Sequence, residues 1–146
     1  MKRTLCILAL LALVAQAHAA PDLGKALEGT NWRWDTYKLK GVTFVSRMET
    51  PVTLRFFKSS VSWIEDCNGV IGRYILKNHR LSVPHPIGTQ KFCGSEKSAV
   101  ASALGGFMKH GVIVKLDFKN GLPSELTLNS ATSSGVMTLI PAREKR

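Results

Sequence analysis

Acidic residues are scarce in this chain of 146 residues, which has 10 Asp and Glu against 20 Lys and Arg. Cysteine is rare as well, with three residues, and no long apolar run follows the first 20 positions. Low-complexity linkers and repeats with a period of 20 to 50 residues are also lacking. These absences argue against a multidomain, repeat or membrane-spanning architecture and favour one compact domain.

The N-terminus has the pattern of an export signal. Lys2 and Arg3 precede an apolar run at positions 5–14. Ala17 and Ala19 provide the small residues expected before a cleavage site after Ala19. The run of about ten residues is too short for a bilayer, which needs ~20 residues, although an uncleaved N-terminal anchor is the alternative.

We therefore expect a signal peptide at 1–19 and a single domain at 20–146, with no transmembrane segment in the mature chain. Cys6 lies inside the apolar run, so it is not a lipidation site, and the expected localisation is the periplasm or the medium. Cleavage leaves 18 basic against 10 acidic side chains, a net charge of about +8. An exported protein of this charge meets anionic envelope components before it meets nucleic acid. The basic tail at 142–146 is interpreted as a solvated terminus.

Cys67 and Cys93 are the thiols that remain after cleavage. In an oxidising compartment an even number of cysteines predicts a disulfide, here Cys67–Cys93. Unpaired buried thiols are the first alternative. A catalytic cysteine with a histidine base is the second, but the three remaining histidines (His79, His85 and His110) lie in no recognisable catalytic signature. The ligand spacing of a metal site is also missing, so we expect no metal and no other cofactor.

Apolar residues alternate with polar ones through most of the chain after Asn31, which predicts half-buried strands. The alternation is present at 31–37, 52–56, 61–63, 112–118, 126–128 and 136–140. Turn residues separate these segments at 58–60, 67–69, 77–79 and 119–121. Short strands joined by short turns predict antiparallel neighbours.

One segment has helical spacing instead. Ser95 is a suitable N-cap, and the apolar positions at 97–108 recur every three to four residues up to a C-terminal signature at Gly111. The expected fold class is therefore α+β: an antiparallel, strongly curled sheet or partly open barrel of seven to eight strands with one amphipathic helix. Large aromatic side chains are available for its core, although Trp32, Trp34 and Trp63 are alternatively candidates for lining a ligand cavity.

Several short motifs occur in an order that resembles the META domain family, the group of HslJ-like heat-shock proteins. Residues 27–32 are similar to its L-x-G-T-x-W opening. Residues 67–74 are similar to its C-N-x-x-x-G-x-Y segment, and 89–93 to its T-x-x-x-C element. The resemblance covers about residues 25–141. The motif positions, which we interpret as structural, are Gly29, Thr30, Trp32, Asn68, Gly72, Tyr74 and Thr89.

The resemblance implies a small α+β domain of the bacterial envelope, associated with stress tolerance, and no catalytic residues. For the motif, Asn and Gly are expected to accept left-handed backbone geometry, and Tyr to hydrogen-bond at a sheet edge. The leading expectation is a non-enzymatic, monomeric protein that binds an envelope protein or an anionic envelope component. The alternative is a carrier of a small apolar ligand, and an enzyme comes third.

Overall fold

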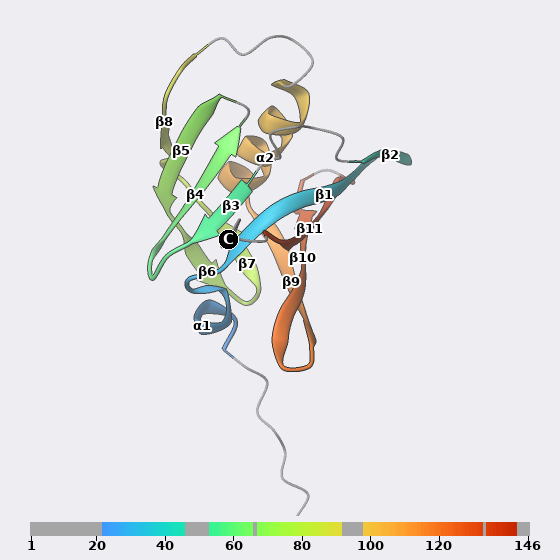
Figure 1. Ribbon diagram of the computed structural model, residues 1–146. Coiled ribbons are helices and arrows are strands. Elements are labelled where there is room, and N and C mark those ends of the chain that lie inside the picture. Colours follow the sequence, from blue (N-terminus) through green and yellow to red (C-terminus); the bar gives the residue numbers. More distant parts are fainter. Residues whose placement is uncertain (1–21, 46–52, 66, 92–97, 133, 143–146) are drawn as a thin grey trace, which may run out of the picture.

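The computed structural model describes residues 22–45, 53–65, 67–91, 98–132 and 134–142. The predicted signal peptide, the predicted N-cap Ser95 and most of the basic tail lie outside these residues. The described chain forms a strongly curled antiparallel sheet with two helices, α1 and α2 (Figure 1). The α+β class and the curled antiparallel sheet are therefore confirmed.

The predicted number of strands was wrong, because the sheet has eleven strands within the described residues and not seven to eight. A second helix, α1, is also present. The elements in chain order are α1 Leu23–Leu27, β1 Asn31–Leu39, β2 Val42–Val45, β3 Thr53–Phe56, β4 Ser60–Glu65, β5 Asn68–Arg73, β6 Ile75–Lys77, β7 Arg80–Ser82, β8 Ile87–Gly88, α2 Ser98–His110, β9 Val112–Lys119, β10 Leu122–Ser130 and β11 Val136–Pro141.

The missed elements are short or lack the alternation that predicts strands. Strands β6 and β8 have three and two residues. Strand β5 contains Gly69 and Gly72, and we had assigned its start to a turn at 67–69. In β2 every residue is exposed, so it has no buried face. Helix α1 has five residues and begins at the N-cap Asp22, whose side chain accepts from two backbone N–H groups of the first turn.

Neighbouring strands run in the order β6-β7-β9-β10-β11-β1-β3-β4-β5-β8, all antiparallel. The long strand β1 pairs with β11 on one side. On its other side, Asn31–Arg33 pair with β3, and the second half of β1 pairs with β2. A register shift between Trp34 and Thr36 interrupts the pairing with β11 near the changeover. Such a bulge bends a strand and increases its twist, which helps the sheet to curl.

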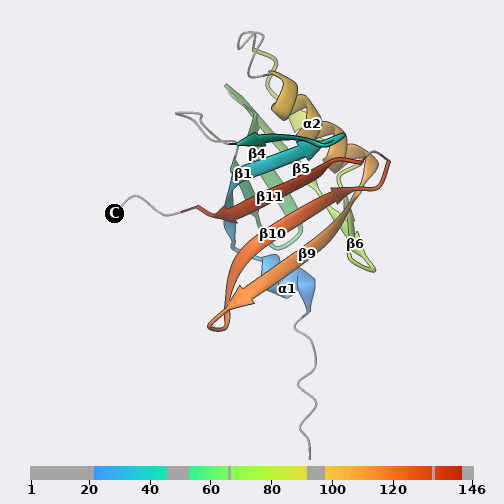
Figure 2. The same cartoon turned by 90° about the vertical axis from the view of Figure 1, so that its right-hand side faces the viewer.

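Helix α2 contacts β7 and β10 in one half of the strand order and β4 in the other half. Figure 2 shows the strands β9, β10, β11 and β1 side by side across one wall of the curled sheet, with α2 above them. The inward side chains form one apolar core that includes all three tryptophans. The hairpin turn predicted at Asn120-Gly121 is present, with positive φ at both residues (54° and 77°).

Candidate functional site

The first family motif forms a connected structure at the end of α1. Gly29 has φ +76°, and its N–H donates to the carbonyl of Phe56 on β3 (3.1 Å). The hydroxyl of Thr30 donates to the Leu27 carbonyl and accepts from Nε1 of the buried Trp32 (2.7 Å). A threonine here therefore satisfies the indole donor and ties α1 to the sheet. Gly29, Thr30 and Trp32 thus all take part in the junction between α1 and the sheet.

Replacing Thr30 by valine is expected to lower the free energy of unfolding by about 2 kcal/mol, because the Trp32 N–H keeps its burial and loses its acceptor. The Thr30→Ser variant retains the hydroxyl and is expected to lose less than about 1 kcal/mol. Urea denaturation of the two variants measures the difference. A larger loss in Thr30→Ser than in Thr30→Val would show that the methyl group and not the hydrogen bond matters.

The second motif holds the segment after β8 against β5. The amide of Asn68 donates to the Lys91 carbonyl (2.9 Å), and its oxygen accepts from the Lys91 N–H (2.7 Å) and from the Thr89 hydroxyl (3.0 Å). The N–H of Gly69 donates to the Thr89 hydroxyl (3.2 Å). Asn68 and Thr89 therefore connect two distant segments through side-chain bonds. This role replaces our expectation of left-handed backbone geometry, since neither Asn68 nor Gly69 has a positive φ.

Cys67 lies directly before this network and is disulfide-bonded. Cys93 lies outside the described residues, so the pairing Cys67–Cys93 stays a prediction. The position agrees with it, because Lys91, two residues before Cys93, is held next to Asn68.

Gly72 is needed for space and not for a left-handed conformation. A Cβ atom at this position would lie 2.3 Å from Cγ1 of Val83 and 3.2 Å from the Pro86 backbone. Next to it, the ring of Tyr74 packs edge to face on Phe56, and its hydroxyl donates to the Lys58 carbonyl (3.4 Å). Burial raises the pKa of the Tyr74 hydroxyl, and nearby carboxylates add to the rise. Tyr74 therefore stays neutral at physiological pH, and its hydroxyl bonds to the turn between β3 and β4 and not at a sheet edge.

The three tryptophans belong to the core and have exposures of 1% (Trp32), 3% (Trp34) and 1% (Trp63). Trp34 buries its Nε1 with no hydrogen-bond partner among the described residues. Trp32 also borders an open pocket of about 310 Å³ between the first motif and the β9–β10 hairpin. A second pocket, of about 300 Å³, lies between α1 and β9 and is lined mainly by apolar side chains: Leu23, Ala26, His79, Val114, Lys115, Leu116 and Phe118.

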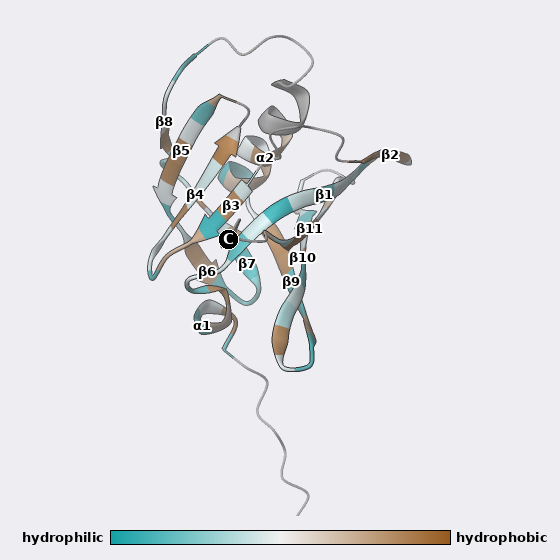
Figure 3. Ribbon diagram, in the orientation of Figure 1, coloured by the Kyte–Doolittle hydropathy of each residue, from teal (hydrophilic) through white to brown (hydrophobic). Residues whose placement is uncertain are grey.

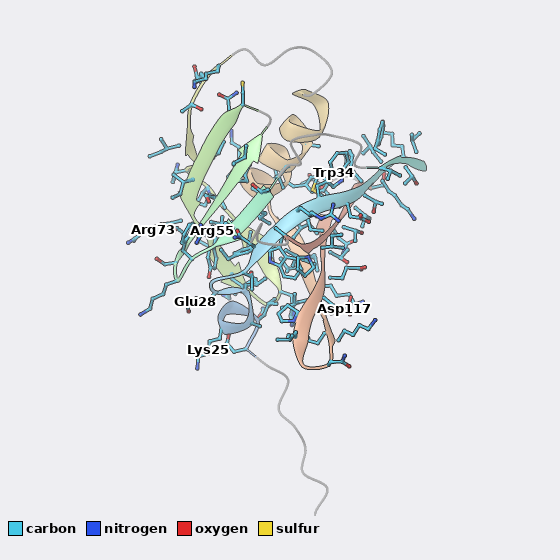
Figure 4. The ribbon with its side chains drawn as sticks, in the orientation of Figure 1. Lys25, Glu28, Trp34, Arg55, Arg73 and Asp117 are labelled. Carbon is cyan, nitrogen blue, oxygen red and sulfur yellow. The ribbon has the colours of Figure 1, made fainter. Side chains whose placement is uncertain are left out.

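A set of arginines lies on the outer face of the sheet, where sequence reasoning had identified no site. Alternation places Arg33, Arg55 and Arg73 opposite the core residues of β1, β3 and β5. Ser60 and Ser62 of β4 lie between the last two arginines. We call these five residues the arginine face. Figure 4 shows Arg55 and Arg73 together on the β3–β5 side of the molecule, away from Asp117.

Strand register gives the arrangement of the arginine face. Asn31 pairs with Arg55, so Arg33 is displaced by two residues from Arg55 on the adjacent strand. Arg55 pairs with Ser62, and Ser60 pairs with Arg73. With strands ~4.8 Å apart and ~3.4 Å per residue, the Cα atoms are about 8 Å apart for the first arginine pair and about 12 Å for the second. The three side chains therefore form one diagonal row across four strands.

The guanidinium groups of this row are available to a ligand. Within the described residues, none of the three has a hydrogen bond or ion pair to a carboxylate. Arg55 lies over the ring of Phe57, 5.2 Å from its centroid, which orients the guanidinium without neutralising it. A guanidinium is planar and charged at all physiological pH values, and its donors match carboxylate and phosphate oxygens in pairs. This row is therefore suited to an anionic ligand.

The described part of the chain contains neither a cluster of metal ligands nor a membrane-spanning helix. No three His, Cys, Asp or Glu side chains there come together as metal ligands. None of its helices has the length and apolar composition needed to span a membrane.

The fold is shared with known proteins. One NMR structure of a protein from Burkholderia xenovorans matches with a TM-score of 0.66 and 20% identity, over 86% of this chain and 94% of that chain. A second protein of known NMR structure matches with a TM-score of 0.60 and 19% identity, over 80% and 92% of the two chains. Likeness at this identity shows the fold alone. Among curated proteins, none matches the chain significantly.

The family follows from the sequence model of the META domain, which matches residues 25–144. The match spans most of the chain, and the motif residues it contains are those that tie α1 and β8 to the sheet. This protein belongs to the META domain family. The predicted family resemblance is therefore confirmed.

Proposed function

We propose that this protein is an exported, monomeric, non-enzymatic member of the META family that binds an anionic envelope component through the arginine face, and that it acts under envelope stress. The observation that carries the proposal is the row of Arg33, Arg55 and Arg73 with no carboxylate partner among the described residues. The motif residues support it indirectly, because each has a structural role within the fold and none is left over for catalysis.

The arginines of the described residues are concentrated on this face, whereas the lysines are not. Three of the four arginines in the described residues lie in this row. The fourth, Arg80, donates to the carbonyl of His110 at the end of α2 (3.0 Å) and therefore has a structural use. The lysines of the described residues, in contrast, are scattered over both helices, several strands and the turns between them. A ligand whose oxygens need paired hydrogen-bond donors in a fixed geometry should bind more strongly to the arginine row than to the scattered lysines.

The test compares two variants that lose the same charge at different places. One is Arg33→Gln/Arg55→Gln/Arg73→Gln. The other removes three exposed lysines that lie outside the row, on α1, at the end of α2 and at the end of β9: Lys25→Gln, Lys109→Gln and Lys119→Gln. The ligand is inorganic polyphosphate of fixed length, and binding is measured by calorimetry at several salt concentrations with the chain from residue 20 on.

The arginine variant is expected to bind polyphosphate about 150-fold more weakly, because each of the three cations contributes about 1 kcal/mol near an anionic surface and about 1.4 kcal/mol corresponds to a factor of ten. Its salt dependence should also become shallower, since fewer counterions are released. The lysine variant should lose less than about 3-fold. Equal losses in both variants would mean that net charge alone causes binding, which would refute a specific site.

The carrier function remains second. The pocket between α1 and β9 favours it, because its apolar walls and its volume of about 300 Å³ match the lower end of small-ligand sites. Lys115 at its rim is already bonded to Asp117 (2.9 Å). The tryptophans that first suggested a carrier lie in the core. The arginine row is therefore the better supported site.

A further inference from the structure

Beside the arginine face lies a group of exposed aliphatic side chains. Ile64, Ile71 and Ile87 lie on β4, β5 and β8 and are exposed to 44%, 49% and 76%. Ile71 and Ile87 are direct cross-strand partners, and Ile64 is two residues from Ser62, the partner of Ile71. We call these three residues the isoleucine cluster. Figure 3 shows hydrophobic stretches on β4, β5 and β8, where the cluster lies.

Both groups share one surface. The pairings Arg55 with Ser62, Ser62 with Ile71, and Ile71 with Ile87 place one arginine and two isoleucines in the same cross-strand row. Arg73 is two residues from Ile71 on β5, so both side chains point to the same side of the sheet. The surface therefore has cations along one diagonal and aliphatic groups next to it. Exposed apolar residues beside a sheet edge risk aggregation unless they have a use.

We propose that this mixed surface docks onto an anionic lipid bilayer, with the arginines at the lipid phosphates and the isoleucine cluster in the interfacial region. This proposal rests on the proposed function and names its ligand. Positive charge and exposed aliphatic area are the two properties that bind a protein to an anionic bilayer from one side.

A bilayer fits this surface better than a soluble acidic protein does. Protein interfaces depend on Trp, Tyr and Arg anchors that fill pockets. Of these residue types the described surface offers arginine alone, because all three tryptophans and both tyrosines lie in or against the core. None of the six side chains of the row and the cluster lines any of the pockets found between described elements. A fluid bilayer needs no complementary pocket and accepts aliphatic side chains directly.

The experiment measures cosedimentation of the protein with two kinds of vesicle. One is phosphatidylcholine alone, and the other, which is the anionic probe, contains about one third phosphatidylglycerol. The protein used starts at residue 20, because the apolar run at 5–14 would bind lipid by itself. This shortened chain contains every described helix and strand. The test variant is Ile64→Thr/Ile71→Thr/Ile87→Thr, since threonine keeps the β-branched shape that strands favour. The control replaces exposed aliphatic residues of the other half of the sheet: Ile75→Thr, Ile113→Thr and Leu122→Thr.

Wild-type protein is expected to bind the anionic vesicles and not the neutral ones. The isoleucine variant should bind the anionic vesicles at least about 10-fold more weakly and polyphosphate within about 2-fold of wild type, because it retains all arginines. The control variant should bind both as wild type does. If the triple variant fails to fold, Ile87→Thr alone, at the most exposed position, should still weaken vesicle binding about 3-fold.

Two results overturn the proposal separately from the proposed function. Vesicle binding unchanged in the isoleucine variants would refute bilayer docking and leave the arginine site intact. Polyphosphate binding by wild type without vesicle binding would refute it too and would point to a soluble acidic partner. In contrast, polyphosphate binding unaffected by the arginine variant would refute the proposed function itself.

Discussion

Replacing Gly72 by alanine is expected to lower the free energy of unfolding by about 2–3 kcal/mol, as overpacked core substitutions do. The added Cβ atom would meet Cγ1 of Val83 at 2.3 Å. Val83 is fully buried and β-branched, so it cannot rotate away, and the Pro86 backbone closes the site at 3.2 Å. Strand β5 therefore has to move away from the segment before β8. Urea denaturation of the purified domain measures the loss.

Gly69 provides the matched control on the same strand. A Cβ atom there would have no atom within 4 Å, and the residue has no positive φ. The Gly69→Ala variant should therefore change stability by less than about 1 kcal/mol, the ordinary cost or gain of such a change in an open position. Similar losses in Gly69→Ala and Gly72→Ala would contradict the close approach of β5 to Val83.

Reducing the disulfide of Cys67 is expected to lower the free energy of unfolding by about 3 kcal/mol. A bond to Cys93 closes a loop of about 25 residues, and the chain-entropy model gives an effect of this size. Asn68 and Thr89 still join the two ends of the loop after reduction, so the domain should remain folded at low temperature. Thermal unfolding with and without dithiothreitol measures the change.

Thiol titration identifies the pairing. The chain from residue 20 on should show no free thiol when native and two after reduction, and a Cys67→Ser/Cys93→Ser variant should melt identically with and without reductant. Two reactive thiols in the native exported protein would refute the disulfide and would restore the catalytic-cysteine alternative.

The larger elements of the fold could be predicted because their signals are local. Alternation identified β1, β3, β4, β9, β10 and β11, and helical spacing identified α2, whose described end lies two residues beyond the predicted one. Motif residues were identified by resemblance, but their physical roles were not. Asn68 acts through side-chain bonds to Lys91 and Thr89, more than 20 residues away, and no pattern around Asn68 indicates that distance. The need for glycine at position 72 could not be predicted either, because Val83, which leaves no space for a Cβ atom, lies on another segment of the chain.

For the candidate site too, the sequence predicted some features and the tertiary structure decided the others. The sequence by itself determined that Arg33 and Arg55 point away from the core, because each lies between two large apolar residues of an alternating strand, and side chains of a strand alternate between its faces. It also determined the family, the excess of basic residues and the export pattern. Only the tertiary structure decided that these arginines form one row with Arg73 beside the isoleucine cluster. The face of a residue is set by its immediate neighbours, whereas strand order and register are set by contacts between distant segments as the whole core packs.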